Sequence, residues 1–209
     1  MTTLALEFSS ACRSVALMRD GLVLAEAAET GGYRVTNAFT LIEQVLAQAH
    51  IAREAIEVIA VGLGPGSYTG IRAAIALAQG WQLATGVKVL GVSSTDSLAS
   101  AAQILKIFGR VHGVIDAQRG EYYLATWEIS ATGCIILAPL KIVPADEITT
   151  RQSAGECCIG PEMPAPLFPS ASAVARLAGG RNDFVAGEML EPIYLRETAF
   201  VKAPPARIF

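Results

Sequence analysis

A strand pattern that occurs twice limits the fold more than any other feature of this sequence. Thr3–Phe8 is a short apolar run with Glu7 near its end, and two further strands are expected after it. Val111–Ile115 begins a second set of three strands and leads directly into Asp116. Strands that alternate with helical segments are typical of α/β folds. We therefore expect an α/β protein of two duplicated lobes, each with a carboxylate at the end of its first strand.

The two lobes are expected to differ in size. We expect the first lobe at residues 1–106, a smaller second lobe at 107–191 and an extended, proline-containing tail at 192–209. In the first lobe, strands are expected at 3–8, 14–19, 22–28, 57–63 and 87–92, and helices at 36–50, 71–85 and 95–105. In the second lobe, strands are expected at 111–115, 122–129, 135–143 and 157–160, and helices at 145–150 and 172–177. The pair Asp20-Gly21 predicts a tight hairpin between the second and third strands.

The composition excludes several classes of protein. Hydrophobic residues make up 52% of the 209 residues and charged residues 17%, which is too apolar for a disordered chain. No apolar run reaches the ~20 residues that a spanning helix needs, and no signal peptide is expected at Met1. With a net charge of −3 and no run of basic residues, the chain is not expected to bind nucleic acid on its own. These features predict a cytoplasmic protein with no membrane partner.

The cysteines and histidines predict neither a disulfide framework nor a metal centre. The four cysteines show no C-x-x-C spacing, which favours a reducing compartment. His50 and His112 are too far apart in sequence to form an H-x-x-x-H pair. There is no G-x-S-x-G motif, and Cys12 has no histidine near it in sequence. We therefore expect no metal ligands and no catalytic residues.

A glycine-rich segment, Gly64–Arg72, follows a predicted strand and opens a predicted helix. Its glycines permit close backbone approach, and the start of the helix offers unpaired N–H groups to an anion. Two interpretations are equally supported: a phosphate-binding loop, or a tight strand-to-helix turn with Thr69 as the helix cap. Arg72 lies in the first helical turn, where the helix dipole disfavours a cation, and this favours contact with an anion or a partner.

Glu7 and Asp116 complete this candidate site. Where two lobes meet in a cleft, a carboxylate from each would hold Mg²⁺ beside a nucleotide. The alternative is that each carboxylate caps a neighbouring turn. The candidate anion or nucleotide site comprises Glu7, Ser9, Gly64, Gly66, Ser67, Thr69, Gly70, Arg72 and Asp116.

The helices expected at 36–50 and 71–85 contain many of the chain's apolar residues. The first has an apolar stripe, and the second is rich in alanine and apolar on nearly every side. A helix that is apolar all round is buried all round. Either the second helix lies between the two lobes, or the helix pair packs against another protein. The candidate contact residues are Phe39, Ile42, Val45, Leu46, Ile71, Ile75, Ala78 and Trp81.

Five segments together resemble one protein family. In order along the chain they are Glu7–Ser10, Ser14–Leu17, Gly64–Arg72, Asp116–Tyr122 and Pro192–Arg196. This set is similar to the TsaB (YeaZ) family, bacterial proteins needed to make threonylcarbamoyladenosine in tRNA, and it spans nearly the whole chain. The resemblance implies an actin-like ASKHA fold, of the ribonuclease H-like type, with two duplicated lobes.

The resemblance also implies a function. TsaB proteins are non-catalytic partners that stabilise TsaD, and they lack its metal-binding H-x-x-x-H motif, as this sequence does. TsaD transfers threonylcarbamoyl to the adenosine beside the anticodon of tRNAs that read ANN codons, and TsaE is the third, ATP-hydrolysing member. In the family the two helices of the first lobe form the heterodimer with TsaD, and a homodimer when TsaB is alone. The resemblance thus implies that the helix pair is an interface and that tRNA is met only through the complex.

Glu7 departs from the family pattern, because members usually carry aspartate at this position. The longer carboxylate favours a scaffold without a cofactor over strict coordination of ATP or ADP with Mg²⁺. Two alternatives remain: a nucleotide-binding ASKHA enzyme that hydrolyses ATP, and a glycoprotease-like peptidase.

Overall fold

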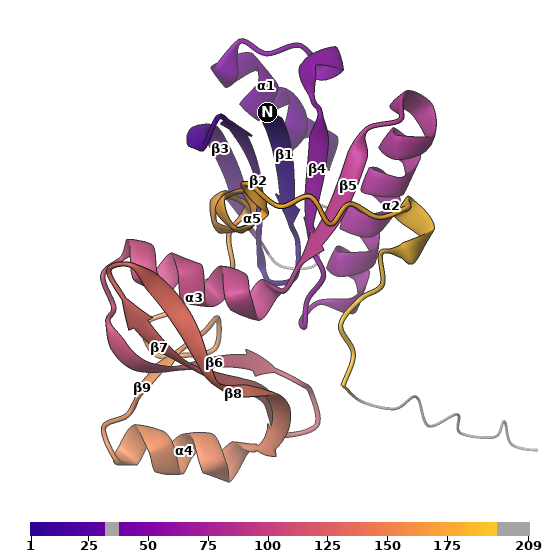
Figure 1. Ribbon diagram of the computed structural model, residues 1–209. Coiled ribbons are helices and arrows are strands. Elements are labelled where there is room, and N and C mark those ends of the chain that lie inside the picture. The colour runs from indigo at the N-terminus through magenta and orange to yellow at the C-terminus, as the bar shows by residue number, and fades with distance from the viewer. Residues whose placement is uncertain (32–37, 196–209) are drawn as a thin grey trace, which may run out of the picture.

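The computed structural model describes residues 1–31 and 38–195, which form two β-sheets with helices packed around them (Figure 1). The first sheet has five strands in the order β3-β2-β1-β4-β5. These strands are β1 (Thr2–Glu7), β2 (Cys12–Arg19), β3 (Leu22–Thr30), β4 (Val58–Gly62) and β5 (Lys88–Val92). β1 pairs antiparallel with β2 and parallel with β4, so it lies at the centre of the sheet.

The second sheet repeats the arrangement of the first. Its order is β8-β7-β6-β9, and its strands are β6 (Gly109–Asp116), β7 (Glu121–Ser130), β8 (Gly133–Pro144) and β9 (Cys157–Ile159). β6 pairs antiparallel with β7 and parallel with β9, as β1 does with β2 and β4. This shared topology confirms the predicted duplication and the actin-like ASKHA fold. The second sheet, as described, has no counterpart of β5, and the second lobe is smaller for that reason.

The hairpin between β2 and β3 turns at the two predicted residues. Asp20 has a φ of 50° and Gly21 a φ of 82°, so both central residues are left-handed. Two-residue turns of this kind match the right-handed twist of paired strands, and Asp-Gly is among their preferred sequences. The local sequence alone therefore determines this turn.

The helices lie close to their predicted positions. They are α1 (Ala38–Ala49), α2 (Tyr68–Thr85), α3 (Ser94–Ile104), α4 (Ala145–Ser153) and α5 (Ala171–Ala178), with short 3₁₀ turns η1 (Arg53–Ala55) and η2 (Gly187–Met189). Residues 36 and 37 of the first predicted helix lie outside the described residues. α2 begins at Tyr68 rather than Ile71, because the Ser67 hydroxyl accepts a hydrogen bond from the Gly70 N–H (3.3 Å) and caps the helix. Thr69 as the cap was therefore wrong.

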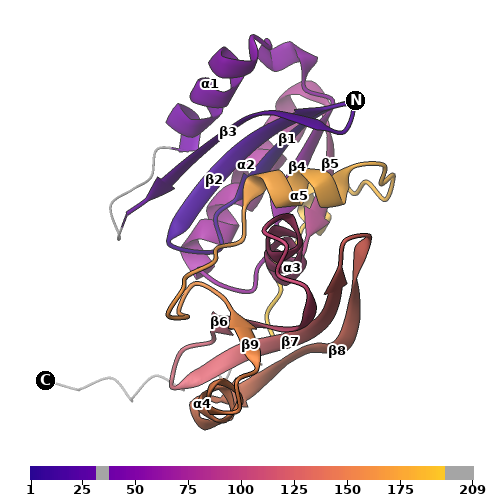
Figure 2. The same ribbon diagram turned by 90° about the vertical axis from the view of Figure 1, so that its left-hand side faces the viewer.

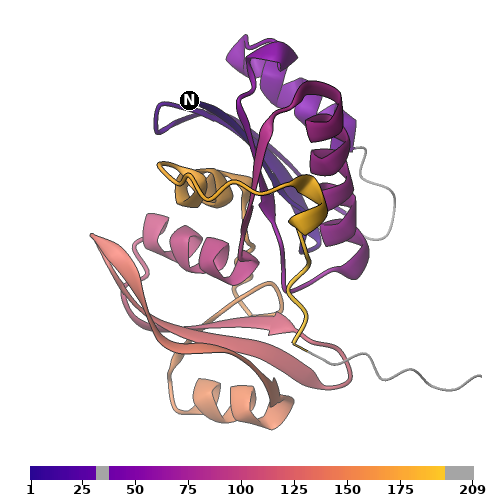
Figure 3. The same ribbon diagram turned by 45° about the vertical axis from the view of Figure 1, so that its right-hand side comes forward.

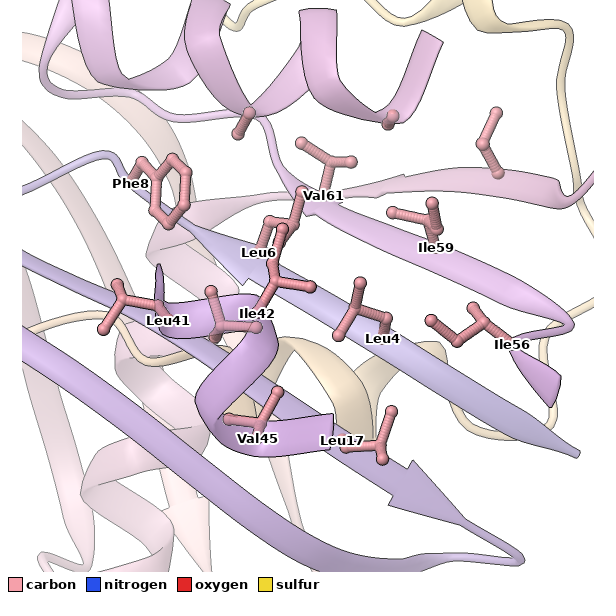
Figure 4. Close-up of a cluster of buried hydrophobic side chains, with 14 of the residues drawn as sticks. Leu4, Leu6, Phe8, Leu17, Leu41, Ile42, Val45, Ile56, Ile59 and Val61 are labelled. Atoms are coloured by element: carbon pink, nitrogen blue, oxygen red, sulfur yellow. The ribbon is translucent and has the colours of Figure 1, made fainter. Parts of the chain in front are cut away.

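The main core lies between the first sheet and the pair α1 and α2. Figure 4 shows Ile42 and Val45 of α1 among Leu4 and Leu6 of β1 and Val61 of β4. The opposite face of the same sheet packs against α5 through small side chains. Every residue of β1 is buried, as expected for a central strand that is covered on both faces.

α3 and α5 lie between the two sheets (Figure 2). α3 packs against the second sheet, where Leu98 and Ala102 contact the cluster around Trp127. α5 packs against β1, β2 and the end of α3. α5, the helix expected at 172–177 in the second lobe, instead packs on the first lobe, because its buried residues Val174 and Ala175 belong to the core of the first sheet.

The chain after α5 also returns to the first lobe. The Val185 N–H donates to the Val89 carbonyl of β5 (3.0 Å), and the Ile193 N–H donates to the Leu63 carbonyl (2.8 Å). Between them, the Gln79 side chain of α2 donates to the Gly187 carbonyl (2.9 Å). We call residues 184–195 the C-terminal strap. The predicted boundary at residue 191 therefore does not separate a second lobe from a tail, and residues 196–209 of the predicted tail lie outside the described residues.

His112 is a buried packing residue of the second sheet and is 3% exposed. Its Nδ1 lies 2.9 Å from the Thr126 hydroxyl and its Nε2 lies 2.8 Å from a Glu156 carboxylate oxygen. Arg151 donates to the same Glu156 oxygen from 2.8 Å. Burial lowers the pKa of His112, and the positive charge of Arg151 lowers it further, whereas Glu156 opposes both effects. The folded protein therefore favours the neutral imidazole.

A lowered pKa in the folded state predicts a pH-dependent stability. The unfolded chain takes up a proton at His112 near its ordinary pKa of about 6.5, and the folded chain does so only at lower pH. The free energy of unfolding should therefore fall as the pH drops below about 6.5, with a slope of up to about 1.4 kcal/mol per pH unit. Urea unfolding of the His112→Gln variant between pH 7.5 and 5.5 should show a shallower fall.

The matched control is His50→Gln, at an exposed histidine on the first lobe. It should keep the wild-type pH dependence. A wild-type slope in His112→Gln would contradict the assigned origin of the effect.

Candidate functional site

The carboxylate of Glu7 is enclosed at the end of β1 and is 0% exposed. Its Oε1 accepts a hydrogen bond from the Ser9 N–H (2.8 Å), and its Oε2 accepts one from the Ser94 hydroxyl (2.9 Å). A side chain at Gly62 of β4 would overlap this carboxylate, so only glycine leaves room for it. Burial raises the pKa of Glu7, and the hydrogen bonds from Ser9 and Ser94 oppose that rise. Glu7 thus joins β1, β4 and the start of α3.

The glycine loop packs directly on the backbone that follows β1. Gly66 has a φ of 145°, and a side chain on it would overlap the Ser9 carbonyl. A side chain on Gly70 would overlap the Phe8 carbonyl. Two donors of the loop are used within the protein, because the Ser67 N–H bonds to the Ser9 carbonyl (2.7 Å) and the Gly64 N–H bonds to the Ser94 hydroxyl (3.0 Å).

The remaining candidate residues do not join this cluster. Asp116 accepts hydrogen bonds from the Gln118 N–H (2.7 Å) and side-chain amide (2.6 Å), so it caps its own turn. Thr69 and Arg72 are exposed on α2. The structure therefore brings together Glu7, Ser9, Gly64, Gly66, Ser67 and Gly70, and leaves Thr69, Arg72 and Asp116 outside.

These residues do not fit the phosphates and Mg²⁺ of a nucleotide. Both oxygens of Glu7 accept hydrogen bonds from the protein, and the loop glycines hold the loop against Phe8 and Ser9 rather than open towards a ligand. Within the described ranges, no group of three or more histidine, cysteine, aspartate or glutamate side chains is placed to hold a metal ion. The geometry favours the tight strand-to-helix turn over the phosphate-binding loop.

α1 and α2 lie on the same side of the first sheet (Figure 3). A groove on this outer side is lined by residues of both helices and of η1. It has a volume of about 500 Å³. Its lining is mainly apolar but includes three charged residues, and it consists of Phe39, Ile42, Glu43, Arg53, Glu54, Ala76, Leu77, Gly80, Trp81, Ala84 and Thr85. Phe39 is 61% exposed, and Leu83, beside the groove on α2, is 91% exposed. We call these exposed faces of α1 and α2 the outer helix surface.

This arrangement corrects the expectation that α2 is buried all round, and it rules out one of the two placements left open for this helix. α2 is apolar on nearly every side, but only one side of it packs on the sheet. It also does not lie between the lobes, since α3 and α5 fill that space (Figure 2). One apolar face of α2 therefore has no cover from the described parts of the chain.

Most of the predicted contact residues belong to the core. Six of them are at most 5% exposed and pack between the helices and the sheet: Ile42, Val45, Leu46, Ile71, Ile75 and Ala78. Because these six side chains have almost no exposed surface, they are not available to a partner. The exception is the edge of Ile42, which lines the groove. Phe39 and Trp81 remain accessible. The exposed surface of α2 also includes Ala76, Gly80, Leu83 and Ala84, which were not among the predicted contact residues. In an alanine-rich helix, hydrophobicity does not distinguish the inner face from the outer one.

Duplicated lobes, a glycine loop after β4 and an apolar helix pair on the outer face of the first sheet define an actin-like two-lobed protein. The family model "TsaD: tRNA N6-adenosine threonylcarbamoyltransferase" matches residues 33–151, more than half of the chain. The chain belongs to this family, and within it to the TsaB (YeaZ) proteins.

Individual relatives support this assignment, two of them over nearly the full length. The tRNA threonylcarbamoyladenosine biosynthesis protein TsaB of Escherichia coli strain K12 is 28% identical over 232 aligned positions, which cover 99% of this chain and 100% of the relative. The TsaB protein of Bacillus subtilis strain 168 is 29% identical, over 61% of this chain and 56% of the relative. Among solved structures, YeaZ from Pseudomonas aeruginosa superposes with a TM-score of 0.78 at 27% identity, covering 93% of this chain and 99% of that one.

The enclosed carboxylate predicts different outcomes for two substitutions of Glu7. Glutamine keeps an acceptor for the Ser9 N–H and a polar partner for Ser94, so Glu7→Gln should change the free energy of unfolding at pH 7 by less than about 1 kcal/mol. Glu7→Ala leaves a cavity and unsatisfied donors and should cost about 2–4 kcal/mol. Urea unfolding at pH 7 measures both values.

The pH dependence of the same variants adds a second measurement. Because the pKa of Glu7 is raised in the folded state, its protonation stabilises the fold at low pH, and this stabilisation is lost as the pH rises through the folded-state pKa. Glu7→Gln should therefore gain stability relative to the wild type as the pH rises. A Glu7→Gln variant as unstable as Glu7→Ala would show that the fold requires the ionised carboxylate, and would contradict the claim that burial favours the neutral form.

Proposed function

We propose that this protein acts in threonylcarbamoyladenosine biosynthesis as a non-catalytic subunit that binds a TsaD homologue through the outer helix surface. The observation that carries the proposal is the uncovered apolar face of α2 beside the groove that contains Phe39 and Trp81. The E. coli and B. subtilis relatives are both named for biosynthesis of this nucleoside, which supports the pathway.

The outer helix surface has the features of a protein interface. Aromatic residues often contribute most of the binding energy of an interface, and the groove is lined by the exposed Phe39 and the partly buried Trp81. The small residues Ala76, Gly80 and Ala84 let a second helix approach the backbone of α2 closely. By the same argument a second copy would use this surface when the protein is alone, so TsaD binding and homodimerisation would exclude each other.

The non-catalytic part of the proposal rests on the described side chains. His50 is exposed in the turn that follows α1 in the first lobe, whereas His112 is buried in β6 of the second lobe. The two imidazoles therefore lie in different lobes. The one fully buried carboxylate at the interlobe end of β1, Glu7, is bonded to protein donors. We infer that the chain works without its own nucleotide or metal, in the cytoplasm, with a TsaE homologue and tRNA joining through the complex.

Two substitutions on the outer helix surface test the proposed contact. Phe39→Asp and Trp81→Asp would each place a charge on an apolar interface, and each should weaken binding of the TsaD homologue from the same organism by at least about 30-fold. Isothermal titration calorimetry with the purified partner measures the loss, and circular dichroism checks the fold. The core positions Ile42 and Ile75 are unsuitable for this test, because aspartate there would unfold the chain.

The matched control is Leu22→Asp. Leu22 is 66% exposed at the β2–β3 hairpin, away from the groove, and its substitution should leave the affinity unchanged. Equal affinities for Leu22→Asp and Trp81→Asp would contradict the assigned surface.

A nucleotide titration distinguishes the scaffold from an ATPase. The isolated chain should show no saturable heat with Mg·ATP or Mg·ADP up to 1 mM, a limit of about −4 kcal/mol in binding free energy. Micromolar binding would instead support the nucleotide-binding enzyme. Stoichiometric zinc by elemental analysis would support a peptidase. One solved structure from Pseudomonas aeruginosa, with a TM-score of 0.79 and 27% identity to this chain, is described as similar to a peptidase.

A further inference from the structure

Arg72, in the first turn of α2, contacts two tyrosines. Its guanidinium carbon lies 4.3 Å from the centre of the Tyr68 ring, and its Nε donates to the Tyr194 hydroxyl at 3.4 Å. The Tyr68 and Tyr194 rings stack with centres 5.9 Å apart and an interplanar angle of 24°. All three side chains reach the surface, with Tyr68 59% and Tyr194 40% exposed. We call these three residues the Arg72 cluster.

The positive charge of Arg72 is not compensated within the described parts of the chain. No carboxylate of residues 1–31 or 38–195 lies within ion-pair distance of it, and the first turn of α2 contains no acidic residue. A cation at the start of a helix is opposed by the helix dipole. Only the Nε has a hydrogen-bond partner, so the two terminal nitrogens of the guanidinium remain available. An exposed arginine that is fixed in place but unpaired is well suited to bind an external anion.

The Arg72 cluster is continuous with the outer helix surface. Residues four apart lie on one ridge of a helix, and Arg72 shares its ridge with Ala76, Gly80 and Ala84, which line the groove. Tyr194 belongs to the C-terminal strap, which is joined to the residue before the glycine loop by the hydrogen bond from the Ile193 N–H to the Leu63 carbonyl. The strap therefore holds Tyr194, and through it Arg72, in a fixed position at the edge of that surface.

We propose that Arg72 binds an aspartate or glutamate side chain of the partner at the edge of the outer helix surface, and that Tyr68 and Tyr194 orient its guanidinium for a two-point contact. A planar guanidinium pairs with a carboxylate through two parallel hydrogen bonds. Fixing the arginine beforehand reduces the entropy that binding costs. The proposal rests on the proposed function, because it assigns the carboxylate to the same partner.

A carboxylate fits the site better than the phosphates of RNA. A protein that binds a nucleic-acid backbone usually offers several cations along it. Around Arg72, the α2 ridge continues with uncharged small residues, and the whole chain has a net charge of −3. A single fixed arginine beside an apolar groove is instead typical of a protein interface, where arginine and tyrosine are enriched among the residues that dominate binding.

The test compares the affinity of the TsaD homologue for four full-length variants by calorimetry. Arg72→Ala should weaken binding by about 10- to 100-fold. Arg72→Lys keeps the charge but loses the paired N–H donors and the flat face of the guanidinium. It should therefore bind only slightly more tightly than Arg72→Ala. Tyr194→Phe keeps the ring and removes the hydroxyl, and should cost about 3-fold through looser orientation of Arg72. Arg176→Ala, at an exposed arginine of α5 on the opposite face of the sheet, is the matched control and should bind like the wild type.

The dependence of affinity on salt separates an ion pair from lost packing. Raising the NaCl concentration from 50 to 500 mM should weaken binding of the wild type and of Arg176→Ala, and should affect Arg72→Ala clearly less. Equal affinities for wild type and Arg72→Ala, or an unchanged salt dependence in Arg72→Ala, would overturn the proposal. Unchanged affinity for the TsaD homologue with reduced affinity of the assembled complex for tRNA would identify a phosphate as the ligand, and would also overturn it.

The same experiment distinguishes the failure of this inference from failure of the proposed function. If Trp81→Asp abolishes binding and Arg72→Ala does not weaken it, the outer helix surface stands and the carboxylate contact is wrong. If the wild-type chain does not bind the TsaD homologue at all, both the proposed function and the carboxylate contact are wrong.

Discussion

The buried carboxylate of Glu7 is the interaction on which the arrangement of the first lobe depends. It joins the end of β1 to the start of α3 through Ser94, and Ser94 in turn holds the first residue of the glycine loop. The loop then packs on the backbone after β1 so closely that its glycines leave no room for side chains. A segment that could have cradled a phosphate is thereby used as structural support. The same contacts fix the start of α2, and so they also position the Arg72 cluster and the outer helix surface.

The apolar character of the chain is explained by two different environments. The central strands are buried on both faces, which accounts for near-continuous apolar runs such as Leu4–Leu6. α2 has the opposite arrangement, since one face packs on the sheet while the other shows alanine, glycine, leucine and tryptophan to solvent. Exposed apolar surface of this kind marks a contact site more often than a defect of folding. The low proportion of charged residues is therefore explained both by the buried cores and by the apolar outer helix surface.

Much of the fold could be predicted from the sequence, because strand periodicity, the Asp20-Gly21 turn and the repeated strand set depend on local residues. The path of the chain after β9 could not. α5 is a short helix of small residues that would fit either lobe, and its position is decided by contacts with distant β1 and β2. In the candidate site, the glycine loop and Glu7 could be identified from the sequence. The close packing of the loop on the backbone of Phe8 and Ser9, which leaves no room for side chains on its glycines, could not. Likewise, Trp81 could be chosen for its type, whereas Ile75 and Ala78 could be recognised as core residues only from their burial.

The return of the C-terminal strap to the first lobe connects these observations. A lobe that ended at β5 would expose the edge of that strand, and the strap covers part of it where Val185 pairs with Val89. The strap then bonds to Gln79 and Gln82 on the flank of α2 opposite the groove and ends against Arg72. α2 is therefore supported by the sheet on one side and by the strap on another, which leaves only its outer face free. Because both supports are built from distant parts of the chain, the outer helix surface takes its final shape only when the first lobe is completely folded.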